Sequence, residues 1–586
     1  MSVPGQKDKF TPELRILVAS LLSMGVILLW AKFFGPKPPV QPPQANRPAV
    51  SAPATPGPAA SPGATTSPTA TTAAAMAPAA PVSVMPVSDA QERSIVIEND
   101  LYRVEISNRG AVVKSWQLKK YMDDAKPQRV LDVVHPDASQ QTGGWPFAVV
   151  LDDEQLQNAA NAGLYQSSST ATSLHAPADA EFTWSDGHLE IKKHFRFDHT
   201  YVVRVETSAS LNGRPINAGL GWLGGFGDLT VTNPAPVETV STYYTENAKI
   251  TTYLHKKLDG LDKWGPGVWQ GGKDFVGIED RYFTAAFLPL NGAAPGTLAT
   301  RYWKTSRTVQ VGGQDTLEPV PEVAVAVPAQ PLAVRVYVGP KDYDDLKRMN
   351  PPLNGLVSFG WMEFIADPLF HGLKWLHNYI PNWGWSIVVL TLIVNMLLFP
   401  LRISSYKTTL KMQRVAPEIK AIQEKYKKYS MRDPRKAEMN KEVMAIYSRE
   451  GINPVGGCFQ MFLQMPVWFG LNTALRFAIE MRHARWFGWI TDLSSKDPYY
   501  VLPVMMGLSM YLVSKMTPMT STDPQQQMMM KIMPITMAGL FMISPISSGL
   551  AVYILTSSVV GIGQQWYLNR THPVVVPVKP VRGKKS

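Results

Sequence analysis

The sequence contains one cysteine, Cys458, among 586 residues, and this excludes an intrachain disulfide. Cys458 lies beside an apolar segment and has no cluster of metal-binding side chains near it in the sequence. A metal site there is therefore poorly supported. For the chain as a whole we expect no metal, no cofactor and no catalytic residues.

Charge is missing from the middle of each long apolar segment in the C-terminal half, where no Asp, Glu or Lys occurs. Ionisable side chains inside membrane helices mark proton and ion pathways. Their absence argues against an ion-coupled transporter. The sequence also shows no internal repeat, which an alternating-access transporter would be expected to have.

Charged and large apolar residues are scarce from Pro36 to Val87, where Pro, Ala, Ser and Thr dominate. Such a segment cannot bury enough surface to offset its chain entropy. We predict a disordered, fairly extended tether over residues 36–93. Residues 1–35 contain a long apolar segment preceded by basic residues, which predicts a retained membrane anchor with a cytoplasmic N-terminus.

Residues 94–350 alternate apolar and polar side chains at the period of a strand, as in the run from Leu332 to Val338. Many such runs with few helical patterns predict an all-β sandwich. Three histidines, His188, His194 and His199, lie close together in this region. Positions 194 and 199 would point to opposite faces of a regular strand, so we expect no zinc site there.

Residues 382–402 form the segment around which the chain is organised. Beyond Ser386, its apolar run as far as Leu401 is broken only by Thr391 and Asn395. This length and composition predict a membrane-spanning helix. Thr391 and Asn395 are four residues apart and therefore share one helix face, which we expect to meet protein or water.

Four further membrane helices are predicted, over residues 455–479, 499–516, 528–546 and 549–568. Together with the anchor and the span 382–402 they make six spans, five of them in a C-terminal core. Charge placement puts both termini, including the basic tail 569–586, in the cytoplasm and the β domain in the periplasm. Residues 356–381 are predicted to form an amphipathic helix in the membrane interface.

Residues 403–453 are predicted to form a cytoplasmic helical hairpin. Between positions 402 and 453, thirteen basic residues outnumber six acidic ones, a balance of +7. Pro417 and Pro434 are typical of first helical turns. The candidate contacts to a nascent chain or ribosome are Arg414, Lys420, Lys427 and Lys428. The alternative is that this charge only sets topology and meets anionic lipid.

The net charge of +11 does not predict sequence-specific nucleic-acid binding, because much of the excess lies in loops that flank membrane spans.

Polar residues recur on particular faces of the later spans. Gln460 and Gln464 are about one helical turn apart, and Tyr553, Ser557 and Gln564 lie within about 40° of one another on a helix. With Thr391 and Asn395 they are candidates to line a shared polar cavity. The alternative is that they form interhelical hydrogen bonds that hold a helix bundle together.

Several short motifs resemble the YidC family of membrane-protein insertases. They are NWGWSI from Asn382, FPL from Phe399, Asn453–Cys458, Gln464-Met465-Pro466, Asp492-Leu493-Ser494, Asp497–Tyr500, Ser548-Gly549-Leu550 and Gln564-Gln565. The resemblance covers nearly the whole chain. It implies a six-helix inner-membrane protein with a periplasmic β-sandwich domain.

The resemblance also implies a function. The family inserts newly made membrane proteins through a hydrophilic groove, alone or beside the Sec translocon, without hydrolysing nucleotides. It implies nascent membrane proteins, the Sec translocon, the ribosome and the lipid bilayer as partners. The groove candidates in this sequence are Thr391, Asn395, Gln464 and Tyr553. Two alternatives are a small-solute membrane transporter and a membrane-tethered periplasmic sugar-binding protein.

The resemblance marks one departure. The family usually has an arginine where this chain has Asn395. A neutral amide hydrates a groove but does not attract acidic residues. We therefore expect hydration of the groove and local thinning of the membrane to promote insertion here.

Overall fold

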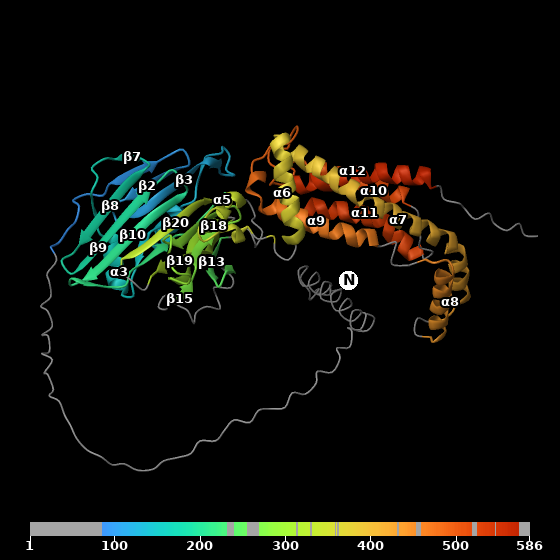
Figure 1. Cartoon of the computed structure of the whole chain (residues 1–586), viewed down its shortest axis with the longest axis horizontal. Helices are drawn as coiled ribbons and strands as arrows, with labels where there is room; N and C mark the ends of the chain where they lie inside the picture. The colour runs from blue at the N-terminus through green and yellow to red at the C-terminus, as the bar shows by residue number, and fades with distance from the viewer. Residues whose placement is uncertain are drawn as a thin grey trace, which may run out of the picture. The chain divides into compact units, whose positions relative to one another are not determined.

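The computed structural model describes residues 85–572, except 231–239, 255–268, 312–313, 328–330, 358, 360–362, 430–432, 453–458, 518–523 and 545. The predicted anchor, most of the predicted tether, Cys458 and most of the predicted tail lie outside the described residues. The predicted β domain and the later helices are described and are shown in Figure 1.

Alternating side chains build the N-terminal half into three sheets. The largest sheet has the order β14 (Lys249–Leu254), β13 (Ser241–Glu246), β16 (Phe275–Glu279), β17 (Phe283–Pro289), β20 (Leu332–Pro340), β10 (Val202–Leu211), β9 (Leu189–Phe197), β8 (Ala178–Ser185) and β6 (Gln166–Ser167), with β11 (Arg214–Pro215) paired to β10. A second sheet has the order β4 (Val130–Asp132), β3 (Val112–Met122), β2 (Tyr102–Ser107), β1 (Ser94–Glu98) and β7 (Ser173–His175). The third has the order β15 (Gln270–Lys273), β18 (Leu298–Val311), β19 (Gln314–Ala326), β12 (Gly219–Trp222) and β5 (Ala148–Val150).

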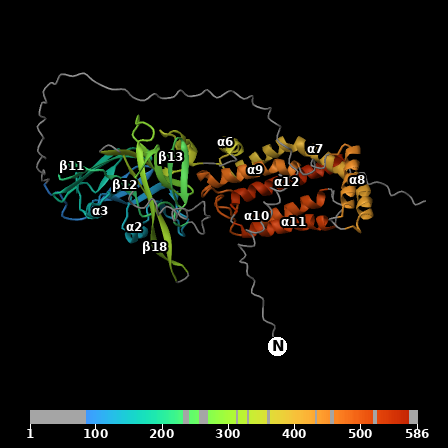
Figure 2. The same cartoon turned by 90° about the horizontal axis from the view of Figure 1, so that it is seen from below.

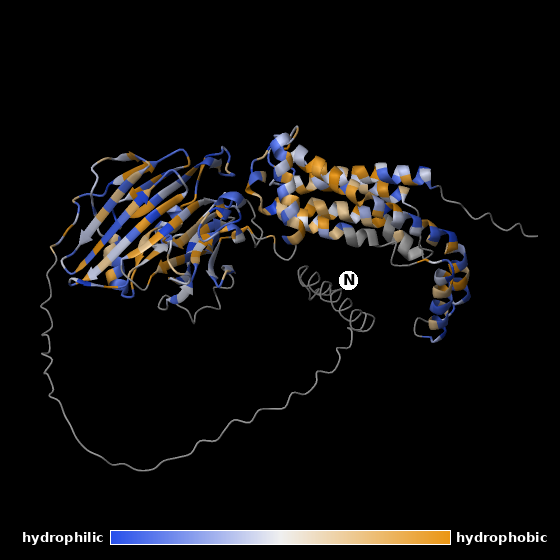
Figure 3. Cartoon of the chain, viewed as in Figure 1, coloured by the Kyte–Doolittle hydropathy of each residue, from blue (hydrophilic) through white to orange (hydrophobic). Residues whose placement is uncertain are grey.

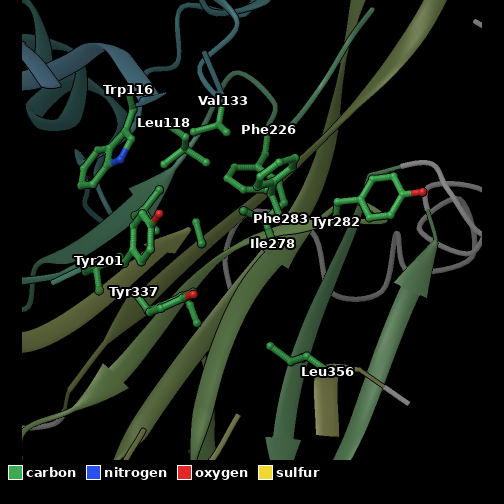
Figure 4. Packing of buried hydrophobic residues seen from close by; sticks show 14 of the residues in the cluster. Trp116, Leu118, Val133, Tyr201, Phe226, Ile278, Tyr282, Phe283, Tyr337 and Leu356 are labelled. Carbon is green, nitrogen blue, oxygen red and sulfur yellow. The ribbon is translucent and has the colours of Figure 1, made fainter. Parts of the chain in front are cut away.

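Aromatic contacts join the large sheet to the two smaller ones. Trp116 of β3 lies 6.3 Å from Phe197 of β9 and 6.4 Å from Trp222 of β12, measured between ring centroids. All three side chains are almost completely buried. Figure 4 shows another part of this core, where Leu118 of β3 lies near Phe226. The inward-facing residues of the alternating pattern therefore form one sandwich core.

The sequence had predicted an all-β domain, but the domain is not purely β. It also contains α2 (Pro136–Thr142), α3 (Glu154–Ala162) and α5 (Tyr343–Lys347). Asp153 begins α3 by accepting hydrogen bonds from the backbone N–H groups of Gln155 and Leu156. The strands β18 and β19 form a long antiparallel hairpin, which Figure 2 shows extending beyond its sheet.

The C-terminal half is helical. Its elements are η2 (Asn354–Leu356), α6 (Glu363–Tyr379), α7 (Trp383–Lys425), α8 (Arg435–Arg449), α9 (Phe459–Phe477), η5 (Ile479–Met481), α10 (Val501–Met516), α11 (Pro524–Ile543) and α12 (Ser548–Thr571). Asn382 begins α7 by accepting a hydrogen bond from Trp385 N–H. In place of one interfacial helix over 356–381, the structure has the short η2 followed by α6.

The helix that begins at Trp383 does not end at residue 402, where the predicted span ends. Helix α7 continues without a break for 43 residues and contains Pro400 and Pro417 in its interior. Pro417 therefore does not begin a new helix. Pro434 occupies the N-cap position of α8, one residue before the helix begins.

By length and composition, α7 is the one helix in the described part of the chain that is long and apolar enough to cross a membrane. Val501–Met516 and Ile532–Ile543 are shorter apolar helices. Figure 3 shows hydrophobic residues dominating the helices of the C-terminal half, whereas hydrophilic residues are frequent on α8.

The end of α7 and helix α8 pack as a hairpin. Val415 and Ile419 of α7 bury against Ile446 of α8, and Ile452 completes the cluster. Ile422, Val443 and Tyr447 pack against this cluster.

Candidate functional site: a polar seam between helices

Polar side chains of α7 and α12 meet inside the helical region. Asn395 is 7% exposed, and its amide lies 3.4 Å from the hydroxyl of Ser557. Gln564, also 7% exposed, donates from Nε2 to the backbone carbonyl of Asn395 at 3.2 Å. Two of the polar positions on α12 thus face the predicted polar face of α7, as the sequence indicates.

Arg402 belongs to the same contact. Its Nη1 donates to Oε1 of Gln564 at 2.7 Å, and its Nη2 donates to the carbonyl of Gly561 at 3.4 Å. We call Asn395, Arg402, Ser557 and Gln564 the α7–α12 polar seam. The Gln564 amide links the two ends of the seam, because it binds Asn395 through its nitrogen and Arg402 through its oxygen.

The sequence analysis counts Arg402 only among the basic residues between positions 402 and 453. A signal was nevertheless present. Arg402 follows Asn395 by seven residues, and positions seven apart on an α-helix lie within about 20° of each other.

Thr391 lies on the predicted face and is 1% exposed. Its hydroxyl donates to the carbonyl of Ile387 at 2.6 Å, and its own carbonyl accepts from Asn395 Nδ2 at 2.8 Å. Both bonds stay within α7. Thr391 therefore helps to orient the Asn395 amide from within α7.

Gln464 and Tyr553 form a separate contact between α9 and α12. Nε2 of Gln464 donates to the Tyr553 hydroxyl at 3.0 Å. Tyr553 is 2% exposed and lies one turn before Ser557 on α12. The Gln464–Tyr553 pair therefore lies next to the seam. The side chain of Gln460, which the sequence grouped with Gln464, lies outside the described residues.

Polar contacts continue beyond the seam, towards the C-terminus of α12. Asn569 accepts at Oδ1 from the Tyr406 hydroxyl at 2.8 Å and from Gln565 at 2.9 Å. Its Nδ2 donates to the carbonyl of Met516 at the end of α10, at 3.0 Å. Amide side chains therefore connect α12 to α7, α9 and α10. Such interhelical hydrogen bonds are one of the two explanations that the sequence left open for its polar residues.

At the opposite end of the helices lies the α9–α10 loop, residues 478–500. This loop contacts both α6 and the β domain. Nζ of Lys374 on α6 lies 3.0 Å from Glu480 of the loop and 2.6 Å from Asp344 of α5. Burial lowers the pKa of Lys374, but these carboxylates together with Asp342 outweigh it and raise the pKa above its ordinary range. The lysine therefore stays charged and ties three elements together.

The same loop contributes His483, whose Nε2 lies 2.7 Å from Oδ1 of Asp124 in the β domain. Burial raises the pKa of Asp124, but the His483 hydrogen bond and the charge of Arg482 outweigh it and hold the pKa below its ordinary value. Asp124 is therefore an anion in this contact.

Asp124, His483 and Asp492 lie close enough together to be considered as metal ligands. The oxygens of Asp492 already accept bonds from the backbone of His483 and from Ser494 and Ser495. Arg482 lies 3.8 Å from Asp124 and adds a positive charge. The group therefore fits a contact between loop and domain better than a cation site.

Two of the three clustered histidines have separate partners. His194 contacts Asp179, whereas His188 contacts Asn212.

The four basic residues proposed to meet a nascent chain or ribosome, Arg414, Lys420, Lys427 and Lys428, are all exposed. Arg414 and Lys420 lie on α7, and the two other lysines follow its end. These four residues thus lie on the surface of the hairpin. In the sequence they follow the seam residues of α7.

Comparison with known proteins covers both halves of the chain. The family described as "60Kd inner membrane protein" matches residues 375–574, and the one described as "YidC periplasmic domain" matches residues 94–372. The membrane protein insertase YidC of Citrifermentans bemidjiense is 35% identical over 566 residues, covering 95% of this chain and 99% of the relative. The YidC of Syntrophus aciditrophicus is 31% identical over 507 residues, covering 83% of this chain and 87% of the relative.

Among solved structures, the chain is similar to a crystal structure of an active YidC insertase with its first transmembrane domain resolved. The identity is 16% and the TM-score 0.35, with 83% of this chain and 95% of that chain covered.

Proposed function

Because the chain belongs to the YidC family of membrane protein insertases, we propose that the α7–α12 polar seam is the path by which polar parts of a new membrane protein cross the bilayer. The protein is an insertase of the inner membrane with a periplasmic β domain and a helical C-terminal region. It acts on nascent membrane proteins.

The observation that carries the proposal is the placement of hydrogen-bonding groups inside an apolar helix. From Asn395 to Arg402, the face of α7 that meets α12 offers amide, guanidinium and carbonyl groups. A polar segment that leaves water needs such partners, because an unsatisfied polar group in hydrocarbon costs several kcal/mol. The seam provides replacements for those lost hydrogen bonds.

In this proposal the seam opens towards the cytoplasm and the lipid when a client arrives, and becomes the hydrophilic groove. Thr391 and Asn395 supply its upper part, and Gln464 and Tyr553 supply the wall that α9 contributes. The client exchanges its bonds to water for bonds to these side chains, and local thinning of the membrane shortens its path. No covalent step is needed, so we infer that the protein is not an enzyme.

The proposed topology has six spans, with α7, α9, α10, α11 and α12 as the core and residues 1–35 as the first span. Both termini lie in the cytoplasm. The α7–α8 hairpin then also lies in the cytoplasm, where Arg414, Lys420, Lys427 and Lys428 meet the nascent chain or ribosome. The Sec translocon is a further proposed partner. In this topology α6 lies in the interface on the periplasmic side of the inner membrane.

Site-specific photocrosslinking tests the path. A photoreactive residue is placed at position 395, and a matched control at position 397 on the same helix, where Leu397 is 75% exposed whereas Asn395 is 7% exposed. Ribosome-stalled chains of a single-span client are prepared at increasing lengths. We expect a crosslink from position 395 at short lengths that fades as the chain grows.

Crosslinks that arise equally from both positions at all lengths would mean that the client contacts lipid-facing surface, and would contradict the proposal. A second measurement uses Asn395→Leu in proteoliposomes. We expect insertion of the same client to fall, because the seam loses the amide that binds Ser557. Unchanged insertion would also contradict the proposal.

A further inference from the structure

A tight turn in the α9–α10 loop, which we call the aromatic turn (residues 486–490), exposes two large aromatic side chains. Phe487 is 64% exposed and Trp489 is 36% exposed. The backbone N–H of Ile490 donates to the carbonyl of Phe487 at 3.2 Å, and the N–H of Trp486 donates to the carbonyl of Ile490 at 3.1 Å. Gly488 has a φ of 58°, a conformation that glycine adopts without steric cost. The two exposed rings are therefore carried by an ordered turn.

The aromatic turn lies against the first turn of α7. The rings of Trp486 and Trp385 are 5.7 Å apart between centroids. A Cβ built on Gly384 would lie 2.1 Å from Cδ1 of Trp486, so a glycine is needed for the indole to approach this closely. Nδ2 of Asn382, the N-cap of α7, donates to the carbonyls of Arg485 and Trp486 at 3.3 Å. The aromatic turn is therefore level with the beginning of α7.

The beginning of α7 is where this long apolar helix enters the bilayer. Trp385, in its first turn, is 46% exposed. Tryptophan is enriched at membrane–water interfaces, because its side chain has an apolar body and a polar end. Trp489 has this arrangement, since its Nε1 donates to Oδ1 of Asp497 at 3.0 Å while its ring stays partly exposed. Grouped apolar side chains beside a membrane helix are typical of a lipid contact.

The same loop also holds the β domain. Arg482 pairs with Asp228, and Nε2 of His483 lies 2.7 Å from Oδ1 of Asp124. Arg482 precedes Phe487 by five residues, so their Cα atoms are at most about 18 Å apart. The layer that surrounds Phe487 therefore sets how far this part of the β domain lies from the bilayer.

We propose that the aromatic turn inserts Phe487 and Trp489 between the headgroups and acyl chains of the periplasmic leaflet, and so holds the β domain against the membrane surface. The partner is the phospholipid bilayer itself. Membrane binding of this kind increases with the apolar area that is buried in the lipid. The inference uses the proposed orientation of α7, but it does not depend on the seam being the path of the client.

Fluorescence quenching in phosphatidylcholine vesicles tests the inference. Full-length protein carrying Cys458→Ser and one introduced cysteine is labelled with an environment-sensitive fluorophore and reconstituted. The cysteine replaces Thr491, which is exposed and directly follows the aromatic turn, so that the turn itself is unchanged. Two other labelled proteins are references. Leu317 is 72% exposed on β19 of the β domain, and Leu397 is 75% exposed on α7.

We expect a nitroxide lipid labelled near its headgroup to quench the probe at position 491 roughly threefold more than the probe at position 317. Aqueous iodide should quench position 317 more strongly. A nitroxide at the end of the acyl chain should act mainly on position 397. Phe487→Ser should reduce headgroup-level quenching at position 491 roughly twofold, because the turn loses its larger exposed apolar surface. Leu317→Ser, which also removes an exposed apolar side chain, is the matched control and should leave it unchanged.

Equal quenching by iodide at positions 491 and 317 would overturn the inference, because the aromatic turn would then face water. Quenching at position 491 that matches position 397 with the deep nitroxide would also overturn it, because the turn would then lie in the hydrocarbon core. Headgroup-level quenching that survives Phe487→Ser would show that the aromatic turn is not the anchor. Client insertion is not part of this measurement, so a failure of the seam as the client path would leave these expected results unchanged.

Discussion

The guanidinium of Arg482 donates to the carboxylate of Asp228, and both side chains are buried where the α9–α10 loop meets the β domain. Their side chains are 2% and 4% exposed. Removing one partner of a buried ion pair leaves a charge with reduced compensation, which typically costs about 3–5 kcal/mol. This buried ion pair therefore joins the loop to the domain.

Asp228→Asn should loosen this link. We expect the backbone amides of the α9–α10 loop to exchange hydrogen faster in the full-length protein, by an amount equivalent to about 3 kcal/mol. Asp179→Asn is the control, because Asp179 pairs with Arg196 at an exposed site where 58% and 54% of the side chains are accessible. An exposed pair contributes little. Equal exchange in both variants would contradict the buried contact.

Lys193 is completely buried in the β domain, and its Nζ donates to the carbonyls of Gly110, Ala111 and Phe147 at 2.7, 3.1 and 2.7 Å. Burial lowers the pKa of Lys193 to about 7. Lys193→Met removes the cost of burying the amine, but it leaves three carbonyls without this donor. We expect the β domain to lose about 2 kcal/mol of stability.

Hydrogen exchange of β9 in the full-length protein measures this loss. Lys192→Met is the matched control, because Lys192 is the next residue, has a 48% exposed side chain and contacts Glu190. It should change stability little. A Lys193→Met variant as stable as this control would show that the three carbonyls find other partners.

His135 makes the β domain sensitive to acid. Burial lowers its pKa from 6.5 to about 4, and its Nε2 lies 2.8 Å from the carbonyl of Gly227. Between pH 6.5 and 4 the unfolded chain therefore binds a proton that the folded chain does not. The free energy of unfolding should fall across this range by about 3 kcal/mol as pH decreases. His135→Gln should remove this contribution.

Glu322 acts in the opposite direction. Burial raises its pKa from 4.5 to about 6, so the folded chain binds the extra proton, and stability is lost as pH rises from 4.5 to 6. The contributions of Glu322 and His135 therefore partly cancel in the wild type. Measured by exchange and corrected for its intrinsic pH dependence, Glu322→Gln should steepen the loss of stability on acidification. The same pH profile in wild type and both variants would contradict these shifts.

Tyr553→Phe removes the hydroxyl that binds Gln464 between α9 and α12. A hydrogen bond between membrane helices contributes about 0.6 kcal/mol on average. We therefore expect a small but measurable drop in the thermal stability of the protein in detergent. Tyr567→Phe is the control on the same helix, where Tyr567 is 49% exposed. If the two variants are indistinguishable, the Gln464–Tyr553 bond does not contribute to stability.

The sequence predicted the strands and the polar faces because each depends on a local period. Asn395 faces α12 as its spacing from Thr391 indicated, and Gln564 lies on the matching face. The end of α7 was misplaced because a proline looks the same at the first turn of a helix as in its interior. Only the surrounding residues decide whether the helix tolerates the missing N–H of Pro417.

Contacts between distant segments left no comparable signal. Asp228 and Arg482 are 254 residues apart, and neither lies in a sequence motif that would identify the other as its ion-pair partner. Arg402 was counted only among the basic residues between positions 402 and 453, whose charge is explained equally well by membrane topology. Its role in the seam depends on where Gly561 and Gln564 of another helix lie, and a single sequence does not contain that information.

The continuity of α7 has a mechanical consequence. Helix α7 contains the seam residues Asn395 and Arg402 and also forms the first arm of the packed hairpin. A force applied to the hairpin is therefore transmitted along one continuous helix. Pro400 removes one N–H from the helix and marks a natural flexing point within the seam, between Asn395 and Arg402. From there to Lys425 the arm is about 37 Å long. A rotation of about 10° at that point would move the hairpin end by about 6 Å, and it would turn Arg402 relative to Asn395.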